Sequence, residues 1–377
     1  MRPARYNLTD TERLDWLRLS RTEHVGPIVF RQLLARFGNA GAALEALPEL
    51  ARRGGVARAL APCPPGAAER EIAALARAGG RFVACVEPDY PSPLAALEDA
   101  PPLVSLVGDA AILGRRSIAV VGARNASTNG RRFAEDIARD LGQRGFAVVS
   151  GLARGIDTAA HRGSLPSGTV AVVAGGIDVI YPPENEALHR AIAERGALVA
   201  ELAPGTQPQA RHFPRRNRII AGLSLGVVVV EAALRSGSLI TARFALEQGR
   251  QVMAVPGSPL DPRCRGANHL IRQGAALIES ADDVMAALEG MAAPRSPAPI
   301  SLVTAPPMPD GAAEDGLVAA RHAIAEQLGP TPVAVDELLR QCHLSAASVN
   351  AVLLELELAG RLERHPGNRV CLVSAGD

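Results

Sequence analysis

Apolar residues occur with two different periods along the chain, and the clearest pattern lies between about Leu103 and Glu289. Short apolar runs bounded by glycine, serine or charged residues predict buried β-strands there. The run Val227–Val230 is apolar on both faces, as a parallel strand covered on both sides requires. Seven strands are predicted: Leu103–Val107, Ile118–Gly122, Ala147–Ser150, Val170–Ala174, Leu198–Leu202, Val227–Val230 and Val252–Val255.

Helical segments such as Gly130–Gly142 and Leu239–Gly249 separate these strands. Alternating strands and helices predict an α/β fold with a doubly wound, Rossmann-like parallel sheet and right-handed crossovers. Ligands of such sheets bind beyond the carboxyl ends of the strands. The loops that follow the strands are therefore where binding residues are expected.

Different patterns flank this region. From about Thr9 to Gly55, two helical patterns surround a turn at His24–Pro27, which resembles a helix-hairpin-helix or SAM-like unit. Such a hairpin presents backbone N–H groups to a phosphate, but an ordinary helical packing unit fits the pattern equally well. From Leu317 to Val373 the pattern is helix, helix-turn-helix with Ser345 as a cap, and a β-hairpin, which predicts a winged helix.

These patterns divide the chain into four parts. We predict an N-terminal helical domain over residues 1–66 and an extended Rossmann-like domain over residues 67–290. Residues 291–311 carry six prolines and little periodicity, so they are predicted to be a linker. The winged-helix domain is predicted over residues 312–377.

Composition limits the class of protein. With 377 residues, of which 47% are hydrophobic and 21% charged, the chain has enough apolar side chains for two or three globular domains. It contains no apolar run of about 18 residues, and its N-terminus lacks an apolar signal core, so we expect a cytoplasmic protein without a membrane span. Its five cysteines are scattered without a C-x-x-C pair and without a close histidine partner, which argues against a zinc site and a disulfide framework; no metal or cofactor is expected.

Charge gives a second limit. The net charge is only +1, and all 40 basic residues are arginine. Mechanisms that need a lysine, such as Schiff-base formation or a P-loop, are excluded. Recognition of phosphate would have to use arginine side chains and backbone amides.

Three of the predicted strand ends combine glycine with groups that bind anions. After the first, Gly122 and Arg124 precede a helix that Ser127 or Thr128 would cap, so amides, a helix dipole and a guanidinium would converge on an anion. Each of these turns is also compatible with a purely structural role. The predicted anion-binding residues at the other two ends are Ser150, Gly151 and Arg154, and Ser236, Gly237 and Ser238.

Asp157 and His161 follow the second of these ends and share one helix face at i, i+4. They fit an acid/base pair, but structural roles, with Asp157 orienting the loop and His161 packed or hydrogen-bonded, fit better because no nucleophile elbow or metal-ligand spacing accompanies them.

The segment Arg211–Arg218 has the highest density of positive charge. It holds four arginines, one histidine and Phe213, without an acid, although arginine averages about one residue in nine. In single-strand recognition, arginines follow the phosphates and an aromatic ring stacks on a base, which contributes roughly 1–3 kcal/mol. The alternative is a solvated basic surface with Phe213 turned to the core.

Several motifs together resemble the DprA family, also called Smf. The resemblance covers about residues 103–285 closely and the flanking domains more loosely. It rests on Gly-Ala-Arg at 122–124, Ser-Gly-Leu-Ala-Arg-Gly-Ile-Asp at 150–157, Phe-Pro-Arg-Arg-Asn-Arg-Ile-Ile-Ala-Gly-Leu-Ser at 213–224, Ser-Gly-Ser-Leu-Ile-Thr-Ala-Arg at 236–243, Ala-Val-Pro-Gly-Ser at 254–258 and Gly-Ala-Asn-His-Leu-Ile at 266–271.

The resemblance implies a non-enzymatic protein that binds single-stranded DNA without base specificity. It also implies a homodimer that loads a RecA-type recombinase onto DNA during natural transformation. Relatives can carry a lysine before the Phe-Pro pair, where this chain has Ala210 followed by Arg211. Combining the strand ends with the family motif gives the predicted DNA-binding set: Gly122, Arg124, Ser150, Gly151, Arg154, Arg211, Phe213, Arg215, Asn217, Arg218, Ser236, Gly237 and Ser238.

The predicted winged helix is acidic. Between Gly311 and Asp377 there are nine acidic residues and five arginines, and the presumed recognition helix Ser345–Ala359 contains no base. A winged helix that binds duplex DNA should be basic there, so we expect this domain to contact another protein or to associate with itself, with Arg361, Arg364 and Arg369 of the wing as the remaining argument for DNA.

Two enzyme classes compete with DNA binding on this fold. A nucleotide-metabolising enzyme resembling phosphoribohydrolases could use Glu231, Asp157 and His161, although the Pro-Gly-Gly-x-Gly-Thr loop of that group is absent. A dinucleotide oxidoreductase is disfavoured because no G-x-G-x-x-G follows the first strand.

Overall fold

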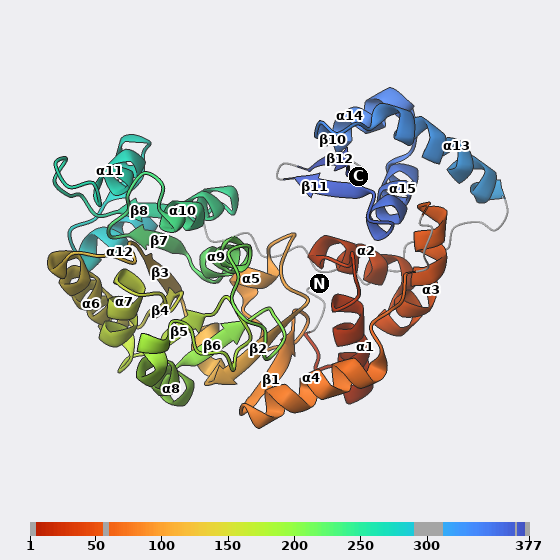
Figure 1. Cartoon of the computed structure of the whole chain (residues 1–377). Helices are drawn as coiled ribbons and strands as arrows, with labels where there is room; N and C mark the ends of the chain where they lie inside the picture. Colours follow the sequence, from red (N-terminus) through yellow and green to blue (C-terminus); the bar gives the residue numbers. More distant parts are fainter. Residues whose placement is uncertain (1–4, 56–59, 290–311, 366–367, 374–377) are drawn as a thin grey trace. The chain divides into compact units, whose positions relative to one another are not determined.

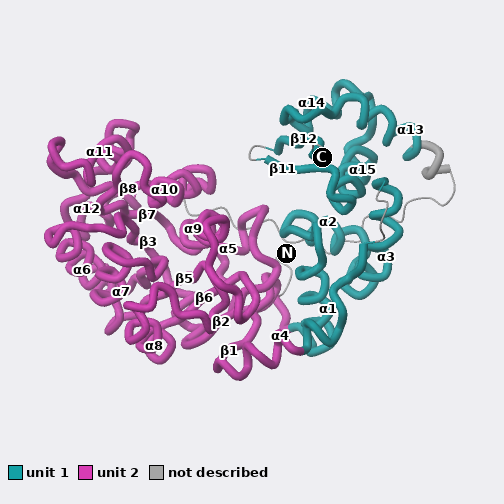
Figure 2. Tube along the Cα trace, viewed as in Figure 1, with its two compact units in different colours: residues 1, 8–69, 299–377 teal, residues 2–7, 70–298 magenta. Residues whose placement is uncertain are grey.

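The computed structural model describes residues 5–55, 60–289, 312–365 and 368–373. The described residues form two compact units, shown in different colours in Figure 2: unit 1 contains residues 8–55, 60–69, 312–365 and 368–373, and unit 2 contains residues 5–7 and 70–289. The predicted linker 291–311 lies outside the described residues. The predicted division at residues 66, 290 and 311 stays a prediction.

Unit 2 is built on a nine-stranded sheet in the order β1-β2-β6-β5-β4-β3-β7-β8-β9. From β6 to β9 every neighbouring pair is parallel, whereas β2 pairs antiparallel with both β1 and β6. The predicted α/β doubly wound sheet is thereby confirmed. The strands are β1 Gly80–Ala84, β2 Leu103–Gly108, β3 Ser117–Val121, β4 Ala147–Ser150, β5 Thr169–Val172, β6 Ala197–Ala200, β7 Gly226–Val229, β8 Gln251–Ala254 and β9 Ala276–Leu277.

Seven of these strands match the predicted ones within two residues at each end. The edge strands β1 and β9 were not predicted. β1 starts with a half-buried glycine and an exposed arginine, and β9 has only two residues, so neither produces a long apolar run. The sequence also did not predict that β2 runs against β6, because pairing direction depends on the path of the connecting chain.

Helices cover both faces of the sheet (Figure 1). On one face, Ile118, Val148 and Val228 pack into a continuous apolar core with side chains of the helices α6, α7 and α12. On the other face, α9 and α10 pack against each other and contact β3, β7 and β8. The helices of unit 2 that follow the first strands are α5 Ser92–Ala95, α6 Thr128–Gln143, α7 Ile156–Ser164, α8 Glu186–Arg195, α9 His212–Leu223, α10 Gly237–Glu247, α11 Arg265–Arg272 and α12 Ala281–Glu289.

The order of the strands creates a switch point between β3 and β7. From β3 the chain moves through β4 and β5 to β6, and it then returns to place β7 on the other side of β3. The loops after β3 and β7 therefore leave the sheet in opposite directions and open a crevice, the usual ligand site of such sheets.

Unit 1 begins with three short helices, α1 Asp10–Ser20, α2 Pro27–Phe37 and α3 Ala40–Arg53. A capping box fixes the start of α1, since the Thr9 side chain accepts from the Glu12 N–H and the Glu12 carboxylate accepts from the Thr9 N–H. Trp16 and Phe30 meet edge to face with ring centroids 5.0 Å apart. The predicted N-terminal helical domain is confirmed, and α4 Pro65–Arg77 follows it.

The winged helix is also confirmed. It consists of α13 Ala312–Gln327, α14 Val335–Cys342, α15 Ala346–Leu358 and a small sheet of β10 Val333–Ala334, β12 Arg369–Leu372 and β11 Leu362–His365. Ser345 caps α15 as predicted, accepting from the Ser348 N–H.

The presumed recognition helix α15 packs inside unit 1 on two sides. It contacts α13, where fully buried Glu355 pairs with Arg321, and it also contacts α2 and α3. Nearby, Arg361 Nη1 donates to the carbonyl of Gly54 at 3.2 Å. These contacts occupy much of the helix surface, but the predicted role of this domain in protein contact or self-association stays a prediction.

The wing brings together residues that are apart in the sequence. His365 Nε2 lies 3.1 Å from Cys371 Sγ, and Glu363 lies beside them. The expectation that no cysteine has a histidine close by is therefore wrong, because β-hairpin pairing sets His365 opposite Arg369, on the strand that carries Cys371 two residues later. None of the described helices is both long and apolar enough to cross a membrane.

Candidate nucleic-acid interface

A groove of about 580 Å³ opens at the switch point, lined by the loop after β3, the loop after β7 and the start of α9. Seven of the predicted binding residues line it: Gly122, Arg124, Phe213, Asn217, Ser236, Gly237 and Ser238. A small adjoining hollow is lined by Gly151 and Arg154, together with Arg124 and Phe213 of the groove. The fold thus brings four separate sequence segments to one surface.

Arg124 and Phe213 form the exposed centre of this surface. Phe213 is half-buried in the first turn of α9, and the guanidinium carbon of exposed Arg124 lies 4.8 Å from its ring centroid. That spacing is typical of a cation–π contact. Tyr181, from the turn after β5, approaches the same ring with centroids 5.9 Å apart and planes tilted by 56°.

Buried Arg216 forms the floor between the groove and the hollow. Its Nη1 donates to the carbonyls of Gly151 and, at 2.7 Å, Val172. Burial lowers the pKa of Arg216 to about 10, with Asp157 opposing and Arg124 adding to that shift. A side chain at Gly151 would collide with this guanidinium, which explains the glycine there better than contact with a phosphate does.

Asp157 and His161 hold the loop after β4 from inside. Asp157 Oδ2 accepts from the N–H groups of Gly151 and Ala153, at 3.1 and 3.3 Å. Burial raises the pKa of the Asp157 carboxyl, and Arg216 and the two N–H groups oppose this. The structural interpretation of Asp157 is thus supported by its contacts.

The imidazole of fully buried His161 bridges two backbone segments. Its Nε2 accepts from the Leu152 N–H at 3.3 Å. Its Nδ1 lies 2.7 Å from Thr169 Oγ1, whose proton is donated to the Val148 carbonyl, so Nδ1 is assigned as the donor. Burial first, and the charge of Arg216 second, lower the pKa of His161 to about 3.

This low pKa gives a testable pH dependence. The unfolded chain binds a proton at His161 near pH 6.5 and the folded chain does not, so stability is full above pH 6.5 and falls as pH drops toward 3. Between pH 7 and pH 5 the loss from this residue should be about 2 kcal/mol. Urea unfolding of wild type and of His161→Gln at pH 7 and pH 5 gives the free energy of unfolding of each protein. The loss between the two pH values should be about 2 kcal/mol larger in wild type than in His161→Gln.

Comparing the two proteins cancels the contributions of the other titrating groups, which both proteins share. One of these groups is Asp157, whose raised pKa makes the folded state more stable as the pH falls, opposite to the effect of His161. Equal pH slopes for the two proteins would show that His161 is not held neutral in the folded state.

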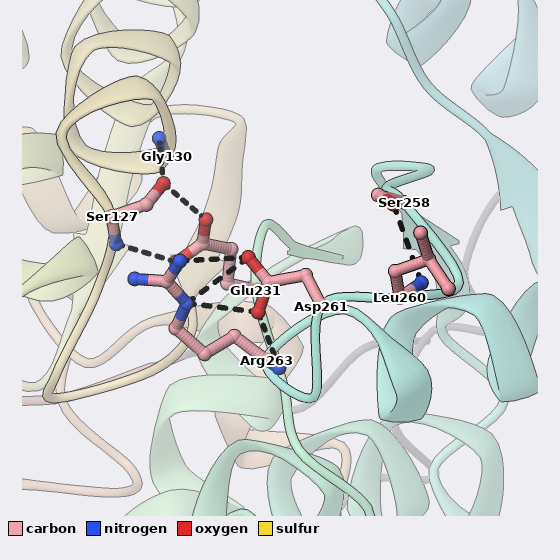
Figure 3. Close-up of polar contacts among 7 residues, drawn as sticks. All are labelled: Ser127, Gly130, Glu231, Ser258, Leu260, Asp261 and Arg263. Carbon is pink, nitrogen blue, oxygen red and sulfur yellow. Dashed lines mark hydrogen bonds and ion pairs between the residues drawn. The ribbon is translucent and has the colours of Figure 1, made fainter.

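The start of α6 differs from the prediction. Ser127 caps the helix as expected, accepting from the Gly130 N–H at 2.9 Å. However, the Glu231 carboxylate from the loop after β7 accepts from the Ser127 N–H at 2.9 Å and from its hydroxyl at 2.5 Å. Figure 3 shows Glu231 directed at Ser127, with the Asp261–Arg263 ion pair beside it. An internal carboxylate thus occupies the place predicted for a ligand anion.

The start of α10 remains part of the groove. Ser236 caps this helix, and its side chain accepts from the Ser238 N–H at 3.4 Å. Asn217 Nδ2 donates to the Gly237 carbonyl at 3.3 Å, which links α9 to the start of α10. Asn217 is buried, so its contacts position the groove wall.

The other four predicted residues do not line the groove. Ser150 is fully buried and donates to the Val120 carbonyl at 2.7 Å, which ties β4 to β3. Arg218 is buried, pairs with Glu201 and donates to the Asp99 carbonyl at 2.5 Å. Arg211 and Arg215 are exposed at the start of α9, one turn apart.

Two arginines and one tyrosine of this surface, none of them buried, lie outside the predicted set. Arg235 and Arg263 line the groove, and Tyr181 lines the hollow. Arg235 directly precedes Ser236, which was predicted to bind an anion, so the sequence could have identified Arg235 as a binding residue. For Tyr181 and Arg263 only the tertiary arrangement reveals the position.

Comparison with family models gives three matches. The model of DNA recombination-mediator protein A matches residues 81–289, the DprA-like N-terminal HHH domain matches residues 10–74, and the DprA winged helix domain matches residues 306–368. The first alone covers more than half of the chain.

Curated relatives and solved structures agree with these matches. The DNA processing protein DprA of Streptococcus pneumoniae is 46% identical over 202 residues, covering 53% of this chain and 71% of that protein. Protein Smf of Escherichia coli is 39% identical over 286 residues, 75% of each chain. The X-ray structure of the Streptococcus pneumoniae protein superposes with a TM-score of 0.62 at 36% identity, covering 74% of this chain and 98% of that one.

A second solved structure concerns the single-stranded DNA binding mode of DNA processing protein A from Helicobacter pylori. It superposes with a TM-score of 0.51 at 27% identity and covers 56% of this chain and 95% of that one.

Proposed function

The chain belongs to the family of DNA recombination-mediator protein A, called DprA or Smf, and on that basis we propose that it binds single-stranded DNA without base specificity along the switch-point groove. The observation that carries this proposal is the exposed Arg124 guanidinium over the half-buried Phe213 ring, at the meeting point of the strand ends. Such a pair offers a charge to a phosphate and an aromatic face to any base.

Charge around the groove supports the same proposal. Exposed arginines come from the segments that form this surface, and none of them is held in a buried ion pair. Arg124 and Arg235 line the groove, Arg154 lines the adjoining hollow, and Arg211 and Arg215 lie at the start of α9, which also carries Phe213. Arg154 lies 3.7 Å from Glu184, with both side chains more than 60% exposed, so this weak pair leaves Arg154 available to a phosphate. We propose phosphate contacts for these five residues and a stacking contact for Phe213. For Ser150, Asn217 and Arg218 we propose structural roles.

The competing enzymatic function is less well supported. The three residues it would use are already engaged internally: Glu231 by Ser127, Asp157 by two backbone N–H groups, and His161 by Leu152 and Thr169. We therefore propose a binding protein without catalytic residues in the groove.

The finer parts of the function follow from family membership. We propose that the chain acts as a homodimer, in the cytoplasm and without a cofactor. We propose also that it delivers DNA to a RecA-type recombinase, as a recombination mediator of natural transformation would. Pull-down of a RecA-type recombinase by the DNA-bound chain, and sedimentation of the free chain, test the partner and the dimer separately.

The test of DNA binding is the salt dependence of affinity for a labelled oligo-dT, measured by fluorescence anisotropy. If each of these five arginines contacts one phosphate, log K should fall with log salt with a slope of about −3.5, at 0.7 per phosphate on a single strand. Arg124→Ala should weaken binding roughly tenfold and make the slope shallower by about 0.7, because one charged contact is lost.

Arg195→Ala is the matched control. Arg195 is an exposed arginine at the end of α8 that lines none of the described pockets. Equal binding by wild type, Arg124→Ala and Arg195→Ala would reject the proposed interface.

A further inference from the structure

Tyr181 is an aromatic side chain exposed without an evident packing reason. Of the described residues, only Tyr6 and Tyr181 are exposed aromatics, and Tyr181 is 44% exposed. Transfer of so large a ring out of water is favourable, so its exposure beside a half-buried phenylalanine is more typical of a binding surface than of a core.

The backbone that carries Tyr181 is held firmly although its ring is exposed. The chain continues through Pro182 into the 3-10 turn Pro183–Asn185, and Asn185 is buried. Asn185 Nδ2 donates to the Leu152 carbonyl and to Thr158 Oγ1, both at 2.9 Å. The Tyr181 turn is thus tied to the loop after β4, which also carries Arg154, so the ring is positioned before any ligand binds.

The ring of Tyr181 faces the same hollow as the proposed DNA contacts. Tyr181, Phe213, Arg124 and Arg154 all line this hollow. The two aromatic planes are tilted by 56° at a centroid separation of 5.9 Å, so they do not stack face to face on each other. Neither ring therefore covers the face of the other, and the arginine side chains beside them match the phosphates between two stacked bases.

We propose that Tyr181 is a second base-stacking position, which receives the nucleobase next to the one on Phe213. This inference rests on the proposed binding of single-stranded DNA. It adds to that proposal a second nucleobase subsite and the path that the strand takes across the surface. The strand passes from the groove over Phe213 toward Tyr181, and its phosphate lies against Arg154. The subsite accepts any base, since stacking uses the π-face that all bases share.

The experiment compares two ligands of equal length and charge, an oligo-dT of about 20 nucleotides and the same backbone with abasic sites throughout. Tyr181→Ala should weaken binding of oligo-dT by roughly 5- to 100-fold and leave binding of the abasic strand unchanged. Tyr181→Phe should restore the affinity for oligo-dT, because the ring and not the hydroxyl makes the contact. Tyr6→Ala, the other exposed tyrosine, is the control and should bind both strands as wild type does.

The outcomes separate this inference from the proposed function. Equal losses on both strands would overturn the stacking role, because a residue that only supports the loop affects backbone and base contacts alike. Wild-type binding by Tyr181→Ala, with weak binding by Phe213→Ala, would reject the Tyr181 subsite and keep the groove. If the wild-type chain binds neither strand, the proposed function and this inference both fail.

Discussion

Replacing Arg216 with methionine is expected to lower the free energy of unfolding by about 3–5 kcal/mol. Arg216 is buried, and its guanidinium satisfies the carbonyls of Gly151 and Val172. Its charge also favours the ionised form of buried Asp157. Methionine fills a similar volume, so the loss comes from two unsatisfied carbonyls and an unbalanced carboxylate.

Denaturant unfolding followed by far-ultraviolet circular dichroism measures this change. The only tryptophan is Trp16, which lies in unit 1, so its fluorescence would not report on unit 2 directly. The control is Arg215→Met, since Arg215 is the exposed neighbour on α9; its effect should stay within about 0.5 kcal/mol. In the Arg216→Met background, Asp157→Asn should recover part of the stability because it removes the buried charge.

If Arg216→Met proves as stable as Arg215→Met, the internal role of Arg216 is wrong. A role in contacting DNA from an exposed position would then have to be reconsidered for the whole Arg211–Arg218 segment.

Replacing Phe213 with alanine is expected to weaken binding of oligo-dT by about 1–3 kcal/mol, roughly 5- to 150-fold. The ring offers a stacking face to a base, and it also holds the Arg124 guanidinium at 4.8 Å. Phe213→Tyr should keep most of the affinity, because tyrosine presents a similar ring. Anisotropy titrations at fixed salt give the comparison directly.

Phe244→Ala is a closely matched control. Phe244 is half-buried on α10, and the guanidinium carbon of Arg243 lies 5.7 Å from its ring centroid, a cation–π arrangement similar to that of Phe213. Phe244 does not line the groove. It should bind oligo-dT as wild type does. A loss of equal size in Phe244→Ala and Phe213→Ala would mean that the effect is on stability rather than on base stacking.

The sequence determined the fold class and the local structure because those features depend on short-range patterns. Seven strands were predicted from apolar runs, and caps were predicted at Ser127 or Thr128 and at Ser345 from their position before helices, of which Ser127 and Ser345 cap in the structure. The family motifs pointed to Arg124 and Phe213, which do lie together in the groove. These residues follow strands of one parallel sheet, so their approach follows from topology.

Only the tertiary structure decided which arginines of the Arg211–Arg218 segment face solvent. The segment begins a helix, and residues one turn apart share a face. Arg211 and Arg215 are exposed, whereas Arg216 and Arg218 are buried against the sheet and Glu201. The density of charge in the sequence could not distinguish the exposed pair from the buried pair, because burial depends on which face of the helix packs against the sheet.

Contacts over long sequence separations were likewise decided by the fold alone. Glu231 occupies the start of α6 although 104 residues separate it from Ser127. Tyr181 meets Phe213 from a different strand end, and α15 is packed against α3 within unit 1. Apolar periodicity and capping signals act over a few residues and are readable in the chain, whereas partners brought together by strand order depend on the whole sheet and had to come from the structure.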